Sequence, residues 1–319
     1  MSPVQISLVI PSYNRGSLIA ETIESALDQS TPFHEIIVVD DGSTDETRAV
    51  VARYSDRVRF IALDNGGVQR ARNTGVAAAS GNYIALCDSD DLLETDFVAT
   101  TAAWLQAHAD VDAVYCNFRT FNRSGIQMNK FDAAPAGYFD GIRREGEFCV
   151  DIGDLYVRLL SYQPLFPTGS VIRKSFYDAI KGYDVRFKGV GSEDLEFTLR
   201  AVDQGKVALC MRPLTRVRKH DGNISGTPMR QVTGEIAILE FALNNHPAAK
   251  RFREAVQDSI RSRRIDLFNT AFARGDFHIA NDVLSRMEGA LRDRKLKVKA
   301  MIMHMPRLVG RPLWRISQA

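Results

Sequence analysis

The stretch SGNYIALCDSDD, residues 80–91, decides the fold of this chain. Its apolar part, Tyr83–Cys87, is followed by carboxylates at Asp88, Asp90 and Asp91. A short apolar run bounded by polar residues is typical of a strand that is buried on both faces. The sequence therefore predicts a central strand whose end carries a cluster of acidic side chains.

The same order of strand, polar turn and helix continues on both sides of this stretch. Alternating apolar strands and amphipathic helices predict an α/β fold, with a mostly parallel sheet and helices on both faces. Such sheets bind ligands where their strands end, so Pro11–Asn14, Asp40–Thr44 and Asp88–Asp91 are expected at one edge. The expected strands before the central one are Ile6–Ile10, Glu35–Val39 and Val58–Leu63.

The predicted organisation has two parts. Residues 1–229 form one domain with halves at about 1–117 and 118–229, and residues 230–319 form a helical C-terminal extension. Residues 120–150 lack a clear period and are expected to form a long loop over the sheet. Ser43 and Glu46 match a capping box, which predicts that a helix begins there. In the extension, amphipathic helices on both sides of Arg274-Gly275-Asp276 predict an αα-hairpin.

The composition is that of an ordinary globular protein, with 25% charged and 45% hydrophobic residues. Residues 230–319 carry 17 Lys and Arg against 9 Asp and Glu, whereas acidic residues are in excess before them. The acidic N-terminal part argues against nucleic acid as a partner, because phosphate backbones require a cationic surface. Scattered cysteines, no signal sequence and no apolar run of about 18 residues predict a cytoplasmic protein, soluble or peripheral at the inner face of the membrane.

Two chemical interpretations fit the acidic cluster at Asp88–Asp91. Carboxylates that share one turn repel each other unless a cation or hydrogen-bond donors compensate them, and Mg²⁺ binds one or two carboxylates together with substrate phosphates. Alternatively, the cluster belongs to the start of a helix near Asp96, where acidic residues are favoured. The pair Asp40-Asp41 poses the same choice between an ordinary turn and a nucleoside site in which Tyr13 stacks on the base.

Five segments of the chain resemble, in this order, family 2 glycosyltransferases with the GT-A fold. They are SLVIPSYN (7–14), IVVDDGSTD (37–45), ARNTG (71–75), SGNYIALCDSDD (80–91) and GSEDLE (191–196). The resemblance covers about 1–225 and implies a Rossmann-like sheet. It also implies an inverting, metal-dependent transfer of sugar from a nucleotide-diphosphate donor, with the UDP type favoured. The implied acceptor is a hydroxyl of a glycan or lipid-linked molecule, as in polysaccharide biosynthesis.

The family's roles for the donor carry over where residues match its motifs. The resemblance implies that Asp90 binds the divalent metal, Mn²⁺ or Mg²⁺, and that Asp88 lies nearer the ribose. It places Arg72 beside the ribose and the diphosphate. The implied pocket for the base contains Pro11, Tyr13, Asp40 and Asp41.

A second group of matches concerns the acceptor. The resemblance makes Asp194 the general base that takes the proton of the acceptor hydroxyl, whereas the residue type alone also fits an acid at a helix start. Glu193, Thr168 and Gly169 are expected on the acceptor side. His220 resembles a histidine that closes over the metal or the diphosphate; a lone histidine is more often structural.

Other functions were weighed against this interpretation. The chain has no G-x-G-x-x-G and no Walker A pattern, which argues against a dinucleotide-dependent oxidoreductase. A nucleotidyltransferase of similar fold, which would release pyrophosphate, is the closer alternative. A non-catalytic relative that binds nucleotide sugars is the third possibility.

The basic and apolar residues of 292–314 permit two interpretations. Lys and Arg at 292–299, followed by apolar residues and Trp314, suit contact with an anionic membrane surface. Alternatively, the apolar residues pack on the protein itself or form a homo-oligomer through the C-terminal helices.

Overall fold

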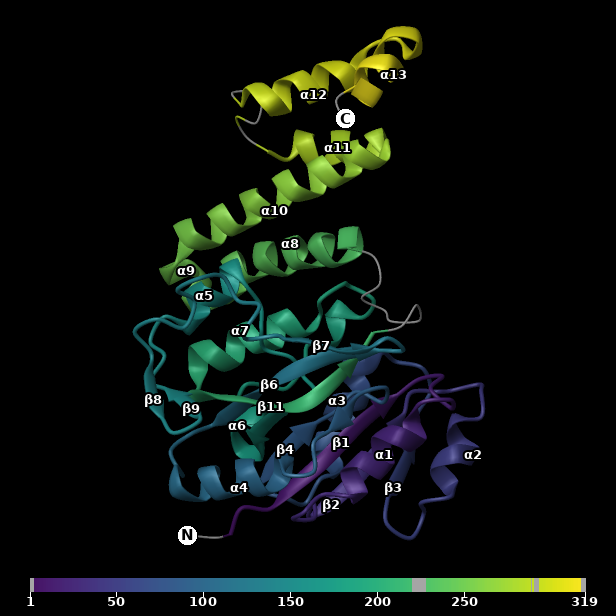
Figure 1. The fold of residues 1–319 in the computed structure, drawn as a ribbon, viewed down its shortest axis with the longest axis vertical. Coiled ribbons are helices and arrows are strands. Elements are labelled where there is room, and N and C mark those ends of the chain that lie inside the picture. Colours follow the sequence, from purple (N-terminus) through teal and green to yellow (C-terminus); the bar gives the residue numbers. More distant parts are fainter. Residues whose placement is uncertain (1–2, 220–227, 288, 290–292, 317–319) are drawn as a thin grey trace. The chain divides into compact units, whose positions relative to one another are not determined.

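The computed structural model of the chain describes residues 3–219, 228–287, 289 and 293–316 (Figure 1). The chain divides into two compact units. The first contains residues 1–189 and 193–223, and the second contains residues 190–192 and 224–319. The first unit is an α/β fold and the second is helical, which confirms the predicted fold class.

The first half of the first unit alternates strands and helices, as the apolar pattern predicts. Its strands pair in parallel in the order β3-β2-β1-β4. β1 and β4 are buried along their whole length, because nearly all of their side chains are apolar. The elements are β1 (Ile6–Ser12), α1 (Ile19–Leu27), β2 (Glu35–Asp40), α2 (Thr47–Ala52), β3 (Arg59–Ala62), α3 (Val68–Ala78) and β4 (Tyr83–Leu86).

The second half of this unit makes the sheet mixed. The strand β10 runs antiparallel between β4 and β6, and β11 runs parallel to β6. The elements are β5 (Leu92–Leu93), α4 (Phe97–Ala107), β6 (Ala113–Asn122), β7 (Gly125–Asn129), β8 (Arg143–Glu145), β9 (Phe148–Val150), α5 (Leu155–Ser161), β10 (Ser170–Arg173), α6 (Lys174–Ala179), the 3-10 turn η1 (Val185–Phe187), α7 (Asp194–Gln204) and β11 (Val207–Arg218).

The prediction of a long loop over residues 120–150 is wrong. β6 continues to Asn122 and pairs with β7, while β8 and β9 form a hairpin on the edge of β11. These strands have three to five residues each. Segments this short show no period of their own, and their pairing depends on partners far away in the sequence.

The capping box expected at Ser43 and Glu46 is also absent. The Ser43 hydroxyl instead accepts a hydrogen bond from the backbone N–H of Asn14, at 2.8 Å. The helix α2 begins later, at Thr47, whose N–H donates to the Asp45 carboxylate. Ser43 therefore joins the turn after β2 to the turn after β1, which is a role in the strand-end region rather than in the helix.

One glycine sets the distance between α3 and the sheet. A Cβ atom at Gly75 would lie 2.3 Å from Cγ1 of Val9 on β1, which is closer than van der Waals contact permits. The absence of a side chain at Gly75 lets α3 pack directly on β1. Arg72 lies one turn earlier on the same helix, so this packing also brings its guanidinium to the strand ends.

The second unit consists of six helices in its described residues. They are α8 (Pro228–Asn245), α9 (Pro247–Arg251), α10 (Arg253–Arg274), α11 (Phe277–Ser285), α12 (Arg294–His304) and α13 (Arg307–Ile316). The predicted αα-hairpin is confirmed, because α10 ends at Gly275 in the left-handed conformation and α11 follows. Within the described residues, no helix combines the length and hydropathy needed to cross a bilayer.

Near the end of the chain, Trp314 packs on other helices of the second unit. The indole N–H of Trp314 donates to the backbone oxygen of Phe272 at 2.7 Å, and its ring meets Phe277 edge to face. Trp314 therefore binds α10 and α11 within the second unit. The large apolar side chains that stay exposed on α12 and α13 are Val298, Met301, Val309, Leu313 and Ile316.

Candidate active site

The polar clusters predicted at one edge of the sheet do meet in the structure. At the end of β4, the Asp88 carboxylate accepts a hydrogen bond from Nη2 of Arg72 at 2.7 Å. The Asp90 carboxylate lies 3.1 Å from Nε of Arg15, which follows β1. Each of these carboxylates thus has a guanidinium as its partner. Arg15 was missed by the sequence analysis, although it directly follows the Pro11–Asn14 cluster.

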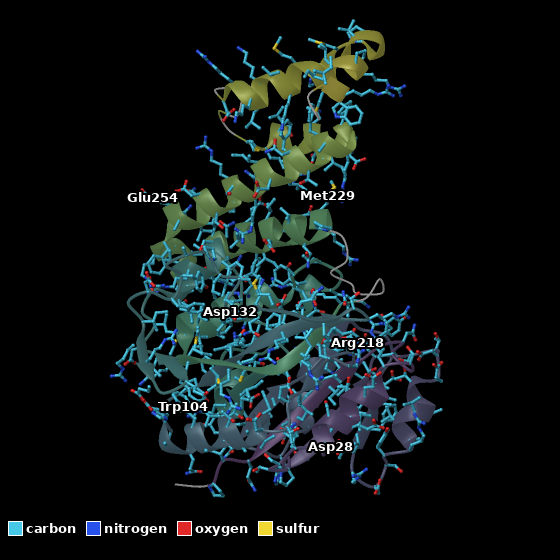
Figure 2. All side chains as sticks on the ribbon, in the orientation of Figure 1. Asp28, Trp104, Asp132, Arg218, Met229 and Glu254 are labelled. Atoms are coloured by element: carbon cyan, nitrogen blue, oxygen red, sulfur yellow. The ribbon has the colours of Figure 1, made fainter. Side chains whose placement is uncertain are left out.

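The third carboxylate of the cluster, Asp91, has a structural role. It is buried, and it accepts hydrogen bonds from the Thr168 hydroxyl at 2.6 Å and from the backbone N–H of Arg218 at 2.9 Å. Burial raises the pKa of Asp91, and the charges of Asp90 and Asp88 raise it further. Asp91 therefore ties the acidic turn to the segment before β10 and to β11, where Arg218 lies (Figure 2).

Thr168 stabilises the acidic turn through its hydroxyl group. Its hydroxyl accepts a hydrogen bond from the Asp88 N–H at 2.9 Å while it donates to Asp91. Its side chain is fully buried, and its place on the acceptor side stays a prediction. The neighbouring Gly169 has a φ of 94° and donates its N–H to Leu86 at the end of β4. Both residues thus support the turn after β4.

Arg72 carries a buried positive charge at the centre of this edge. Its side chain is 3% exposed, and its guanidinium lies 4.9 Å from the centre of the Tyr183 ring. Burial alone would lower the pKa of Arg72. The charge of Asp88 raises this pKa, the charge of Glu193 adds a smaller increase, and the overall shift is upward. Its Nε and Nη1 are buried without a hydrogen-bond partner in the described part of the chain. Free guanidinium donors suit an anionic group such as a phosphate.

The acidic pair Glu193-Asp194 lies at the start of α7, as the resemblance implied. Burial raises the pKa of Asp194 to about 7, the charge of Glu193 adds to this, and Arg72 opposes it. A carboxylate with a pKa near neutrality can exchange a proton at physiological pH. The charges of Asp88 and Glu193 both raise the pKa of Arg72, which therefore lies near both acidic clusters.

Asn73 connects this site to the turn before η1. Its side-chain oxygen accepts hydrogen bonds from the Tyr177 hydroxyl at 2.6 Å and from the Tyr183 N–H at 2.9 Å, and its amide donates to the Tyr183 oxygen. Tyr183 in turn covers Arg72. The role of Asn73 could not be predicted from the sequence, because its partners are more than a hundred residues away.

The residues expected to form the base pocket occupy the ends of β1 and β2. Tyr13 is 45% exposed, whereas Pro11 is buried. Asp40 accepts from the Ser43 N–H at 3.2 Å, and Asp41 accepts from two N–H groups, those of Gly66 and Gly67. The acidic pair thus orders the surrounding loops, and its contact with a base stays a prediction. His220 lies outside the described residues.

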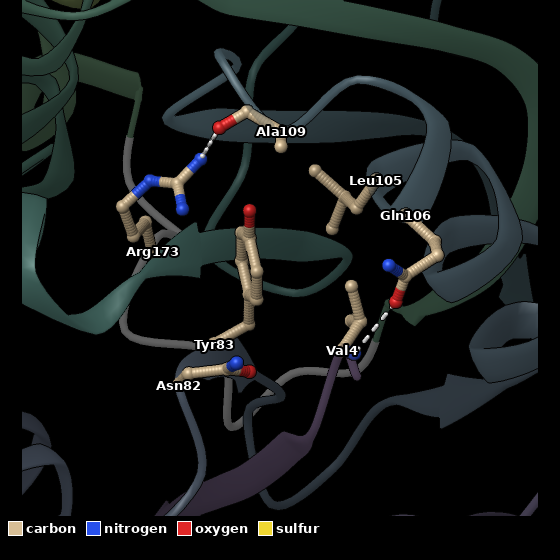
Figure 3. Close-up of a pocket in the computed structure, with 7 residues that line it drawn as sticks. All are labelled: Val4, Asn82, Tyr83, Leu105, Gln106, Ala109 and Arg173. Carbon is tan, nitrogen blue, oxygen red and sulfur yellow. Dashed lines mark hydrogen bonds between the residues drawn. The ribbon is translucent and has the colours of Figure 1, made fainter. Parts of the chain in front are cut away.

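A cavity of about 200 Å³ lies at the opposite edge of the sheet, where β1 and β4 begin (Figure 3). Two of its polar side chains have partners in the protein, because Arg173 donates to the Ala109 oxygen and the side-chain oxygen of Gln106 accepts from the Val4 N–H. The cavity is lined by Val4, Asn82, Tyr83, Leu105, Gln106, Ala109 and Arg173.

The fold and this edge define an α/β protein whose strand ends present carboxylates paired with guanidinium groups, of which that of Arg72 is buried. Residues 7–159 match the sequence model of the family described as Glycosyl transferase family 2. This match supports a family 2 glycosyltransferase, and the fold of the chain is of the GT-A type. The family match favours a glycosyltransferase over the nucleotidyltransferase considered above.

The chain is similar to several characterised proteins. Glycosyltransferase GlyG of Streptococcus pneumoniae serotype 4 is 37% identical over 123 residues, which are 37% of this chain and 40% of that protein. The chain thus spans less than half of the length of this relative.

Two solved structures share the fold. TarS 1-349 of S. aureus in complex with UDP-GlcNAc has a TM-score of 0.65 and 20% identity, covering 99% of this chain and 93% of that one. Mannosyltransferase PcManGT from Pyrobaculum calidifontis, in complex with GDP-Man and Mn2+, has a TM-score of 0.58 and 17% identity, covering 100% and 84%.

The Thr168 contacts predict a loss of stability on substitution. Thr168→Val keeps the shape of the side chain but leaves the Asp91 carboxylate and the Asp88 N–H without this partner. Unsatisfied buried polar groups cost about 1–3 kcal/mol, so the free energy of unfolding in urea should fall by that amount. Thr168→Ser, which keeps the hydroxyl, should lose much less. A Val variant as stable as the wild type would contradict this role for Thr168.

Proposed function

We propose that this chain transfers a sugar, with inversion, from a nucleotide-diphosphate sugar to a hydroxyl of a glycan or lipid-linked acceptor. The observation that carries the proposal is the position of Arg72. Its guanidinium contacts the Asp88 carboxylate at 2.7 Å, and the charge of Glu193 also raises the pKa of Arg72. The proposed donor-binding carboxylates and the proposed base are therefore close enough to act on one substrate.

The proposed donor is a nucleotide-diphosphate sugar, with the UDP type favoured. Structures that share this fold hold UDP-GlcNAc in TarS and GDP-Man in PcManGT. In this chain, the exposed ring of Tyr13 is available to stack on a base. The two unpaired donors of Arg72 would contact the diphosphate.

The residues at the strand ends fit a divalent cation. The side chains of Asp90 and Asp88 are 15% and 26% exposed, so a cation can reach them. Among the residues that the structure describes, no three His, Cys, Asp or Glu side chains group to hold a metal on their own. Mg²⁺ and Mn²⁺ commonly take one or two carboxylates and complete their coordination with substrate phosphates. Asp90 would hold the ion, which would neutralise charge on the leaving diphosphate.

The proposed chemistry at the acceptor is general-base catalysis by Asp194. The carboxylate takes the proton of the acceptor hydroxyl, and the oxygen forms a bond to the anomeric carbon while the bond from that carbon to the diphosphate oxygen breaks. Attack from the face opposite the leaving group inverts the configuration. Burial raises the pKa of Asp194 and the charge of Glu193 raises it further, so Asp194 can hold the proton that it receives.

A lipid-linked acceptor would also give the second unit a function at the membrane. The side chains of Arg294, Lys295 and Lys297 are exposed on α12, and the apolar residues of α12 and α13 named above are exposed as well. We propose peripheral contact with the inner, anionic face of a membrane. A second copy of the chain is the alternative partner for this surface.

Replacement of Asp90 tests the metal site. In wild type, UDP with Mn²⁺ should raise the melting temperature, because a ligand that binds only the native state stabilises it. Asp90→Ala should abolish this metal-dependent stabilisation, since the cation loses its protein ligand. Asp110→Ala is the control, because Asp110 is an exposed carboxylate outside the site. Equal Mn²⁺-dependent affinity for UDP in calorimetry of the wild type and Asp90→Ala would refute the assignment.

Replacement of Asp194 tests the base. Asp194→Asn should leave UDP binding intact and reduce transfer by about 10²–10⁴-fold, the usual contribution of general-base catalysis. Because the pKa of Asp194 lies at about 7, the base form predominates above that pH. The value of kcat/KM should therefore fall as the pH drops below about 7. A wild-type profile that is flat from pH 5 to 8, or an Asn variant with normal transfer, would exclude this role.

Charge removal on α12 tests the membrane contact. Changing Arg294, Lys295 and Lys297 to Gln should release the chain from anionic liposomes at low salt, because each basic residue near such a surface contributes about 1 kcal/mol. Lys299 is left in place because it binds Asn269. The control changes Lys250, Arg253 and Arg261, which are exposed on α9 and α10, to Gln. It removes the same number of positive charges from another surface. If the wild type does not co-sediment with these liposomes, the surface has another partner.

A further inference from the structure

The backbone of Arg15 is fixed by the segment that leads into α2. The N–H of Arg15 donates to the Thr47 hydroxyl at 2.9 Å, and the N–H of Gly16 donates to the Asp45 carboxylate at 3.0 Å. The turn after β1 is thereby joined to the turn after β2, inside the first unit. The backbone of Arg15 therefore keeps its place when the side chain changes its partner.

The ion pair of Arg15 differs from that of Arg72 in its exposure to water. The Arg15 side chain is 20% exposed and its Nε lies 3.1 Å from Oδ2 of Asp90, whereas the Arg72 side chain is 3% exposed and its Nη2 lies 2.7 Å from Asp88. Ion pairs in contact with water contribute little to stability. Separating a buried pair leaves a buried charge uncompensated. Arg15 can therefore leave Asp90 at a small cost in free energy, and Arg72 cannot leave Asp88 in the same way.

The guanidinium of Arg15 occupies the carboxylate that we assign to the divalent cation. A cation at Asp90 would face this guanidinium at short range, and like charges repel there. Arg218 also lies beside the acidic turn, but its Nε donates to the backbone oxygen of Asp90 and its Nη2 donates to Glu21. The carboxylate of Asp90 is thus shared between Arg15 and the cation, whereas these contacts of Arg218 leave it accessible.

We propose that Arg15 changes its partner when the donor binds: it pairs with Asp90 in the free protein and contacts the donor diphosphate once a cation occupies Asp90. The proposal rests on the proposed function, because it requires a nucleotide diphosphate and its cation. A guanidinium displaced from a carboxylate needs another anion, and arginine matches phosphate oxygens in a bidentate geometry. The two arginines then differ in role, since Arg72 offers its donors while it keeps Asp88, and Arg15 binds by exchange.

The exchange makes the contribution of Arg15 depend on the metal. Without Mn²⁺, Arg15 stays on Asp90 and adds little to the binding of UDP. With Mn²⁺, it adds a charge-assisted hydrogen bond to the diphosphate. A permanent phosphate contact would contribute equally in both conditions. A residue that only supports the turn would change the melting temperature without producing this difference.

Calorimetry of UDP binding to Arg15→Gln tests the exchange. With Mn²⁺ the affinity should fall about tenfold, as expected for one lost hydrogen bond to a charged group, and in EDTA it should stay within about twofold of the wild type. Arg15→Lys keeps the charge and should recover part of the affinity with Mn²⁺. Arg57→Gln, at an exposed arginine before β3, should match the wild type in both conditions. An equal loss with and without Mn²⁺, or no loss in either, would overturn the proposal.

Mn²⁺ binding without nucleotide, followed by EPR, is the second measurement. Arg15→Gln should bind Mn²⁺ about two- to fivefold more tightly than the wild type, because no guanidinium competes for Asp90. Equal or weaker binding, or no binding in either protein, overturns the exchange. If the wild type binds Mn²⁺ but neither UDP nor GDP, the proposed function fails and the exchange fails with it. If it binds UDP with Mn²⁺ and Arg15→Gln behaves like the wild type, only the role of Arg15 is wrong.

Discussion

The ion pair between Arg72 and Asp88 is the interaction on which the candidate site depends. Removing a guanidinium from water is costly unless carboxylates and hydrogen bonds compensate it. Asp88 supplies one carboxylate at 2.7 Å, the Tyr183 ring covers the cation, and Glu193 adds its charge. The packing of α3 at Gly75 and the hydrogen bonds of Asn73 both serve to hold these partners in place.

The acidic turn after β4 shows how one sheet edge accommodates three carboxylates. Asp88 and Asp90 are each paired with an arginine, and both stay partly exposed. Asp91 is buried instead and is satisfied by Thr168 and by the N–H of Arg218. The three carboxylates thus have different surroundings, which reduces the repulsion between their like charges. Asp91 stabilises the fold, whereas Asp88 and Asp90 stay accessible to a cation. The two arginine pairs balance the charges of the carboxylates that are not buried.

Much of this arrangement could be predicted from the sequence. Buried parallel strands such as β4 have a strong apolar pattern, and polar residues at their ends must meet at one edge. The strands within 120–150 could not be predicted, because their pairing depends on distant partners. The role of Ser43 and the pairing of Arg15 with Asp90 were missed for the same reason. Each is a contact between loops, and neither leaves a periodic signal in the sequence.

The contact between Gly191 and Gly234 extends this reasoning to the second unit. Sequence alone shows two ordinary glycines, and only the close approach of the backbones explains why each must lack a side chain. Inside the first unit, the hydrogen bonds of Thr168 and Asn73 likewise join segments that are far apart in the sequence. In both units the residue type is explained by a partner that lies far along the chain, so no local pattern in the sequence announces it.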